Sequence, residues 1–165
     1  MVFAAWVLLA GLLTMVFAKV LERQHNPNQQ VQINPRSDGF KEIVLRRNRL
    51  GHYVATGKIN GTKVEFLLDT GATNVAIPLQ VATNLKLKRG VPLTTYTANG
   101  IVQTYATTLD HVALGSISAT GVSANINPHM TGNQILLGMS FLKQFELLQR
   151  GDQLTVRSGT MSDGG

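Results

Sequence analysis

The chain has 165 residues, of which 44% are hydrophobic and 15% are charged, enough for one domain with a core. The absence of cysteine excludes disulfides, thiol catalysis and cysteine-ligated zinc. The formal net charge is +6, but the basic residues are scattered and no aromatic residues interleave them, so the pattern favours solvated faces with some attraction to anionic lipid over nucleic-acid binding.

Residues 1–18 carry no charge, and only Thr14 is clearly polar. An apolar run of this length is just enough to cross a bilayer core as a helix, so we expect a transmembrane anchor over residues 1–23 that meets the membrane through residues 1–18. A cleaved signal peptide is the alternative, because small residues flank Phe17. The lack of a preceding positive region favours the anchor.

The side of the membrane is predicted by two opposing signals. An apolar run at the N-terminus, as in export signals, favours a single-pass protein with its domain in the periplasm. Lys19 and Arg23 follow the run, and a positive-inside count would place them in the cytoplasm. We expect the periplasmic arrangement.

Residues 24–39 contain two Asn-Pro pairs, several glutamines and little to bury, which predicts a flexible tether. Residues 40–158 then read as a single β-rich domain, and residues 159–165 as a disordered tail. Within the domain, Asn60-Gly61 is a strong hairpin signal because both residues tolerate positive φ.

The remaining elements follow from apolar spacing and turn residues. Helices are expected at Leu79–Leu87 and Met139–Phe145. The expected strands are Glu42–Arg49, His52–Ile59, Lys63–Leu68, Val75–Ile77, Val91–Thr97, Ile101–Leu109, His111–Ile117, Gly121–Ile126, Glu146–Gln149 and Gln153–Arg157.

Asp69 is the candidate catalytic residue, because it is a lone acid at the end of the apolar strand Val64–Leu68. An unpaired ionised acid is costly to bury, so such a residue is usually paired, neutralised or in use. Peptide hydrolysis by paired acids needs two carboxylates that share one proton. The motif occurs once, so the second carboxylate would come from a second copy of the chain. The remaining aspartates lack this strand context: Asp38, Asp110, Asp152 and Asp163.

Two further features suit this chemistry. Gly71 allows the loop backbone to approach and hydrogen-bond the acid, and the Thr70 hydroxyl could tie its loop to a neighbouring one. A hairpin is also needed to cover a bound peptide and exclude water. The candidate covering residues are Tyr96, Thr97, Ala98, Asn99 and Gly100.

The stretch Leu67-Leu68-Asp69-Thr70-Gly71-Ala72-Thr73 resembles the active-site loop of aspartic peptidases. Ile135-Leu136-Leu137-Gly138, followed by a short helix, resembles the segment that braces this loop in retropepsins. With Thr97–Gly100 and Leu136–Leu142, the chain is most similar to the retropepsin-like, single-pass membrane aspartic peptidases of bacteria, over about residues 41–158 and the anchor.

This resemblance implies a mainly β, closed β-barrel-like retropepsin fold with one or two short helices after the transmembrane helix. It implies a homodimeric endopeptidase that uses Asp69 of each chain, a peptide or protein substrate, and no metal or organic cofactor. The strand Gln153–Arg157 is expected to join the dimer interface. Ala72 departs from the hydroxyl residue of many pepsins and removes one donor to the carboxylate. The alternative is a dimerisation or peptide-binding module at the membrane with weak or no catalysis.

Overall fold

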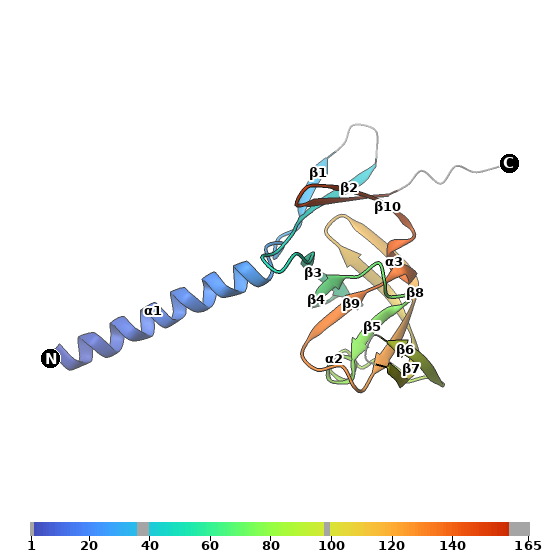
Figure 1. Ribbon diagram of the computed structural model, residues 1–165, viewed down its shortest axis with the longest axis horizontal. Coiled ribbons are helices and arrows are strands. Elements are labelled where there is room, and N and C mark those ends of the chain that lie inside the picture. Colours follow the sequence, from blue (N-terminus) through green and yellow to red (C-terminus); the bar gives the residue numbers. More distant parts are fainter. Residues whose placement is uncertain (1, 36–39, 98–99, 159–165) are drawn as a thin grey trace.

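The computed structural model describes residues 2–35, 40–97 and 100–158, and consists of a long helix joined to a domain of β-strands (Figure 1). The mainly β fold predicted from the sequence is confirmed, including two short helices within the domain. The tail predicted at residues 159–165 lies outside the described residues.

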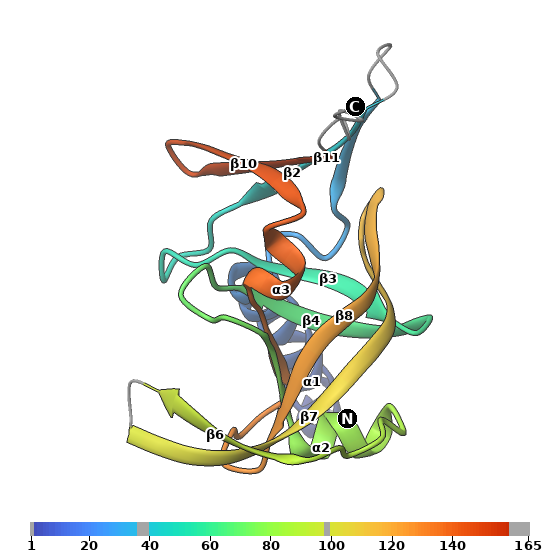
Figure 2. The same ribbon diagram turned by 90° about the vertical axis from the view of Figure 1, so that its right-hand side faces the viewer.

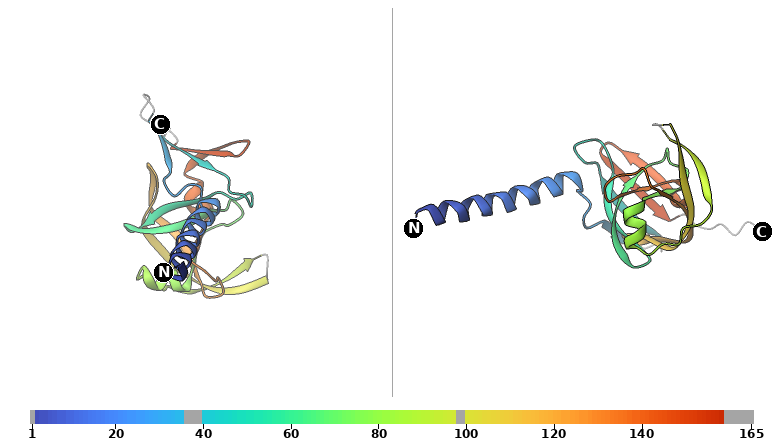
Figure 3. Two further views of the ribbon diagram at one scale, coloured as in Figure 1. Left: turned by 90° about the vertical axis from the view of Figure 1, so that its left-hand side faces the viewer. Right: turned by 90° about the horizontal axis from the view of Figure 1, so that it is seen from below.

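Helix α1 (Val2–His25) extends away from the domain, as Figure 3 shows from two further sides. It is the one helix of the described residues that is long and apolar enough to cross a membrane, over Phe3–His25 with a mean hydropathy of 2.1. None of its apolar window is buried by the rest of the chain, and Phe3 is 83% exposed. A helix with apolar side chains all round and no protein cover suits a bilayer.

The segment expected to be a flexible tether is ordered wherever the structure describes it. Gln24 and His25 complete α1, and residues 32–35 form strand β1 (Gln32–Pro35). Asn28 is 4% exposed, and its side chain bonds to the carbonyl oxygens of Arg46 and Val54 at 2.9 and 2.7 Å. The tether prediction is therefore wrong for this part; residues 36–39 lie outside the described ranges.

A four-stranded antiparallel sheet forms one end of the domain (top of Figure 2). Its order is β1, β2 (Lys41–Arg46), β11 (Gln153–Ser158) and β10 (Phe145–Arg150). Strand β11 pairs on both sides, with β10 and with β2. Its hydrogen-bonding edges are thus occupied within one chain, so it has no free edge for pairing with a second chain; its place in a dimer interface stays a prediction.

A seven-stranded sheet forms the rest of the domain, in the order β3-β4-β9-β5-β8-β7-β6. The strands are β3 (Val54–Ile59), β4 (Thr62–Leu68), β5 (Val75–Pro78), β6 (Pro92–Thr97), β7 (Gly100–Leu114), β8 (Ile117–Asn127) and β9 (Gln134–Leu137). The sheet curls until β3 meets β7, but only Lys58 and Ile59 pair there. The sheet is therefore barrel-like, as predicted, although this short pairing does not formally close it.

The hairpin predicted at Asn60-Gly61 is confirmed between β3 and β4, with φ of 49° and 83° at these residues. Strand β7 is longer than expected, since the predicted break near Asp110 is absent. Gly121 opposite it takes a φ of 63°, and pairing continues on either side, at Leu109 and His111. The strand predicted at His111–Ile117 is wrong, because the chain turns at Gly115, which has a φ of 59°, and β8 begins at Ile117.

Helices α2 (Leu79–Asn84) and α3 (Met139–Leu142) are shorter than predicted. Lys86 has a φ of 55°, which a continuing helix does not permit, and Phe145 already begins β10. Both helices bury apolar residues against one core. Its largest fully buried side chains are Phe66, Phe141, Ile43, Leu45, Ile59, Ile77, Leu109, Leu114, Ile117, Ile126, Ile135 and Leu137.

Candidate active site

Asp69 lies half-buried directly after β4, whose Phe66 is fully buried. Its backbone N–H donates to the carbonyl oxygen of Leu137 at 3.2 Å, which continues the parallel pairing of β4 with β9. Asp69 is therefore held directly after the ends of two neighbouring strands.

The loop after Asp69 folds back on the carboxylate. The Gly71 N–H donates to Asp69 Oδ1 at 2.8 Å, and the Ala72 N–H donates to the Asp69 carbonyl oxygen at 3.2 Å. A Cβ at position 71 would lie 3.2 Å from Oδ1, closer than most side chains tolerate. Glycine thus lets the backbone donor reach the acid. Thr70 is exposed at the tip.

Strand β9 and helix α3 pack against this loop and support it. A Cβ at Gly138 would meet the carbonyl oxygens of Asn74 and Ala72 at 2.3 and 2.6 Å, so only glycine fits. The loop carbonyls of Ala72 and Thr73 accept hydrogen bonds of 2.8 and 2.9 Å from the N–H groups of Met139 and Ser140. Ile135 and Leu137 are fully buried, and Leu136 is half-buried beside β5. The loop is thereby held in place by both β9 and α3.

Ser140 is a positioning residue that the sequence prediction missed. Its Oγ donates to the Ser123 carbonyl oxygen at 2.7 Å and accepts from the Val75 N–H at 3.0 Å. It therefore joins α3 to β5, which follows the loop, and to β8, which pairs with β5. A hydroxyl two residues after the bracing glycine was the signal available in the sequence.

The predicted covering hairpin is formed by β6 and β7, with Tyr96 opposite Ile101. Tyr96 is 80% exposed and Ile101 67% exposed, so the hairpin presents apolar side chains to solvent. Gly100 has a φ of 114°, which favours glycine. In Figure 2 this hairpin and the green loop after β4 extend toward the same side of the domain. Ala98 and Asn99 lie outside the described residues.

Asp69 has no carboxylate partner within the described part of the chain. No ion pair or hydrogen bond there joins it to another acid. Asp110 is bonded to Asn60, Asp152 lies beside Arg47, and Glu65 is bonded to His25 and Asn26. Asp38 and Asp163 fall outside the described residues. One described domain thus offers one catalytic-type carboxylate.

Comparison with known proteins identifies relatives of this chain. The family model described as "gag-polyprotein putative aspartyl protease" matches residues 55–144. An uncharacterized protein in the cobV 5′ region of a Sinorhizobium species is 34% identical over 73% of this chain, and an uncharacterized protein of Rickettsia prowazekii (strain Madrid E) is 32% identical over 64%. The chain spans about half the length of these curated relatives, 54% and 46%.

Among solved structures, a crystal structure of a retropepsin-like aspartic protease from Rickettsia conorii superposes on the chain with a TM-score of 0.62. The sequences are 27% identical, and the match covers 78% of this chain and 96% of that one. The matched share of this chain is comparable in extent to its β domain.

Proposed function

Since the chain belongs to the family of retropepsin-like bacterial aspartic peptidases, we propose that it is an aspartic endopeptidase whose dyad is assembled from two identical chains. The observation that carries this proposal is Asp69 itself. It is held by a braced loop and bonded to Gly71, and it has no second carboxylate in the described part of the chain. A two-fold dimer would bring a second copy of the same loop to it.

The proposed mechanism follows from two carboxylates that share one proton. Like charges so close cannot both ionise, so one Asp69 is a carboxylate and the other a carboxylic acid. The carboxylate takes a proton from a water molecule as the water oxygen attacks the peptide carbonyl carbon. The carboxylic acid protonates the carbonyl oxygen. The tetrahedral diol then collapses: the C–N bond breaks as the protonated Asp69 gives its proton to the nitrogen, and the other Asp69 takes a proton from one diol hydroxyl, so the dyad again holds one proton.

The surrounding residues have positioning roles in this proposal. The Gly71 N–H holds the carboxylate orientation, and the exposed Thr70 would contact the facing loop of the partner. The β6–β7 hairpin would fold over the peptide, with Tyr96 and Ile101 covering it and excluding water. No metal or organic cofactor takes part in this sequence of steps.

The proposed dimer cannot use β11 as a free edge, because it lies between β2 and β10. Strand β10 is the edge strand at that end of the described sheet, with Leu147 and Leu148 half-buried. We therefore assign to β10 the part of the interface that β11 was expected to supply.

The second part of the proposal is that α1 is a single-pass anchor that places the domain on the periplasmic side. Its length and apolar surface support the anchor. An apolar helix of this kind can act as an uncleaved export signal, which favours the periplasm. Cleavage of the domain by protease added to spheroplasts, but not to intact cells, is the expected result.

The experiment that tests catalysis is incubation of the membrane-reconstituted chain and its Asp69→Asn variant with peptide mixtures from acidic to neutral pH. We expect cleavage by the wild type alone. Equal cleavage by both proteins would contradict the peptidase proposal. So would absence of cleavage by either at concentrations where dimers are detected, and that outcome would favour the binding-module alternative.

A further inference from the structure

We propose that the connection between β2 and β3 (residues 47–53) is a second membrane contact, which places Arg49 and Leu50 in the headgroup layer of an anionic bilayer. The proposal rests on the anchoring role proposed for α1. It does not depend on catalysis. Figures 1 and 3 show this turquoise connection beside the base of α1, on the side of the domain from which the helix leaves.

The depth of the connection relative to the bilayer follows from the position along α1 at which the uncharged residues end. The uncharged part of the helix ends before Lys19, so the hydrocarbon boundary lies near that residue. Gln24 is five residues further, or about 8 Å along the axis. The headgroup layer on each side of a bilayer is about 5–8 Å thick. A group in contact with Gln24 therefore lies at the outer edge of the lipid headgroup layer.

The connection is bonded directly to this part of α1. Arg49 donates to the Gln24 side-chain oxygen at 3.1 Å, and the Asn48 side chain donates to the His25 carbonyl oxygen at 3.0 Å. Arg49 is exposed apart from this contact. Its guanidinium has further N–H donors available for phosphate.

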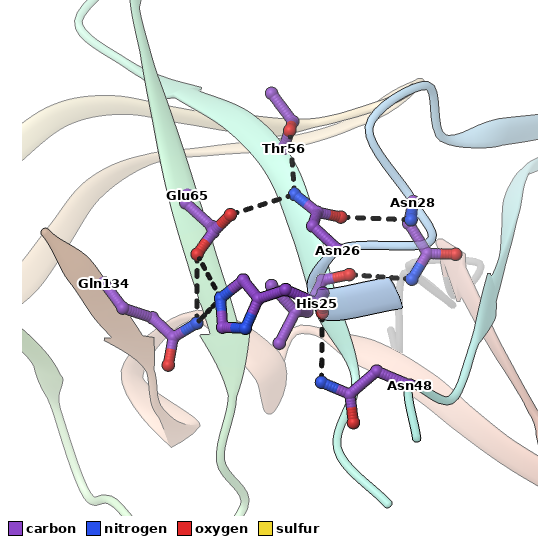
Figure 4. Close-up of polar contacts among 8 residues, drawn as sticks. His25, Asn26, Asn28, Asn48, Thr56, Glu65 and Gln134 are labelled. Atoms are coloured by element: carbon purple, nitrogen blue, oxygen red, sulfur yellow. Dashed lines mark hydrogen bonds and ion pairs between the residues drawn. The ribbon is translucent and has the colours of Figure 1, made fainter. Parts of the chain in front are cut away.

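The angle between helix and domain is fixed by a polar cluster at the end of α1 (Figure 4). Asn26, which is 2% exposed, donates to Thr56 Oγ1 at 3.1 Å and to Glu65 Oε2 at 3.2 Å. The His25 ring lies 3.0 Å from the other Glu65 oxygen, which also accepts from Gln134 at 3.1 Å. These contacts tie the last turn of α1 to β3, β4 and β9. The β2–β3 connection therefore cannot move freely away from the membrane.

Leu50 lies at the tip of a turn that the Asn48 side chain stabilises. The Asn48 side chain is 8% exposed, and its Oδ1 accepts from the N–H groups of Leu50 and His52 at 3.0 and 2.9 Å. Gly51 supplies a φ of 85°. The side chain of Leu50 is 74% exposed at the tip. A single exposed leucine is ordinary on a soluble surface, but here it is held rigidly at headgroup level.

The charges around Leu50 select the lipid. Lys19, Arg23 and Arg49 are exposed on α1 and the connection, and the acid among them is Glu22. Basic side chains at this depth attract anionic headgroups, and a leucine beside them can enter the interface. An anionic bilayer is therefore the partner that fits both the charge and the apolar tip.

The absence of cysteine allows a single-site test. Leu50→Cys is labelled with an environment-sensitive fluorophore, and the full chain is reconstituted into two kinds of vesicle: phosphatidylcholine alone, and equal parts phosphatidylcholine and phosphatidylglycerol. Headgroup nitroxide lipids serve as quenchers. Gln144→Cys is the matched control, because it is exposed, carries no charge and follows α3, which lies away from α1 in Figure 1.

We expect a blue shift and strong quenching at position 50 in the anionic vesicles, a smaller effect in phosphatidylcholine, and none at position 144. Adding Arg49→Gln to the Leu50→Cys chain should reduce the quenching. Equal signals from positions 50 and 144 would overturn the proposal, and no effect of Arg49→Gln would overturn its charge selectivity. Release of the chain from vesicles at alkaline pH would overturn both the anchor and this contact. Peptide cleavage, assayed on the same vesicles, judges the peptidase proposal separately.

Discussion

The Gly71 N–H donates a 2.8 Å hydrogen bond to Asp69 Oδ1 from only two residues away, so the loop orients its own carboxylate. A Cβ at position 71 would sit 3.2 Å from that oxygen. Gly71→Ala should therefore displace the carboxylate by a few tenths of an ångström and lower kcat by about tenfold or more. Thermal unfolding should change little, because the loop tip is exposed. An unchanged kcat would mean that this contact does not position the acid.

Gly138→Ala should act on stability instead. Its Cβ would lie 2.3 Å from the Asn74 carbonyl oxygen, and backbone cannot give way as a flexible side chain can. We expect a loss of about 3 kcal/mol in the free energy of unfolding, measured in urea. Gly61→Ala is the control, because it has open space but a φ of 83°, and should cost about 1 kcal/mol. Equal losses would contradict the close packing inferred at Gly138.

Ser140→Ala removes both hydrogen bonds that link α3 to β5 and β8. The Val75 N–H and Ser123 carbonyl oxygen would lose a partner, which should cost about 1–2 kcal/mol. Because α3 also braces the loop after Asp69, the substitution should make this loop more mobile and lower kcat more than it changes KM. Ser118→Ala, at an exposed position of β8, is the matched control and should leave both quantities unchanged.

Asn28→Ala tests whether the segment after α1 is part of the fold. Its side chain makes three hydrogen bonds to the backbone of Arg46 and Val54, so we expect a loss of about 2–3 kcal/mol on denaturation. Gln30→Ala, at an exposed neighbour, should be neutral. A flexible tether would make both substitutions neutral.

Mixing experiments test the two-chain dyad. When wild type and Asp69→Asn are co-refolded in equal amounts, random pairing leaves about a quarter of the dimers with two aspartates. Activity should therefore fall to about a quarter of that of an all-wild-type sample at equal total chain. A value near one half would indicate that each chain acts alone.

Local signals predicted a large part of this structure. Asn60-Gly61 specified its hairpin because both residues accept positive φ, and Asp69 was conspicuous as an acid after an apolar strand. Bonds between distant residues left no such signal. Asn28 reads as a loop residue, yet its partners lie 18 and 26 positions further along the chain. The main-chain donor to Ser140 is 65 positions away.

The sequence pattern also predicted the wrong length for β7. Asp110 interrupts the pattern of β7, but the left-handed conformation of Gly121 in the facing strand lets pairing resume on either side. The expectation of two shorter strands was therefore wrong for a physical reason: the sequence pattern of one strand does not contain the compensation made by its neighbour.

The polar cluster around Asn26 imposes a symmetry condition. If the helix leaves the domain at a fixed angle, two chains can span the same bilayer in the same sense only when their two-fold axis runs along the membrane normal. A pair related by an axis in the membrane plane would send its helices in opposite directions. Any dimer that unites two copies of Asp69 must therefore satisfy this condition, or break the contacts of Asn26 with Glu65 and Thr56 as it forms.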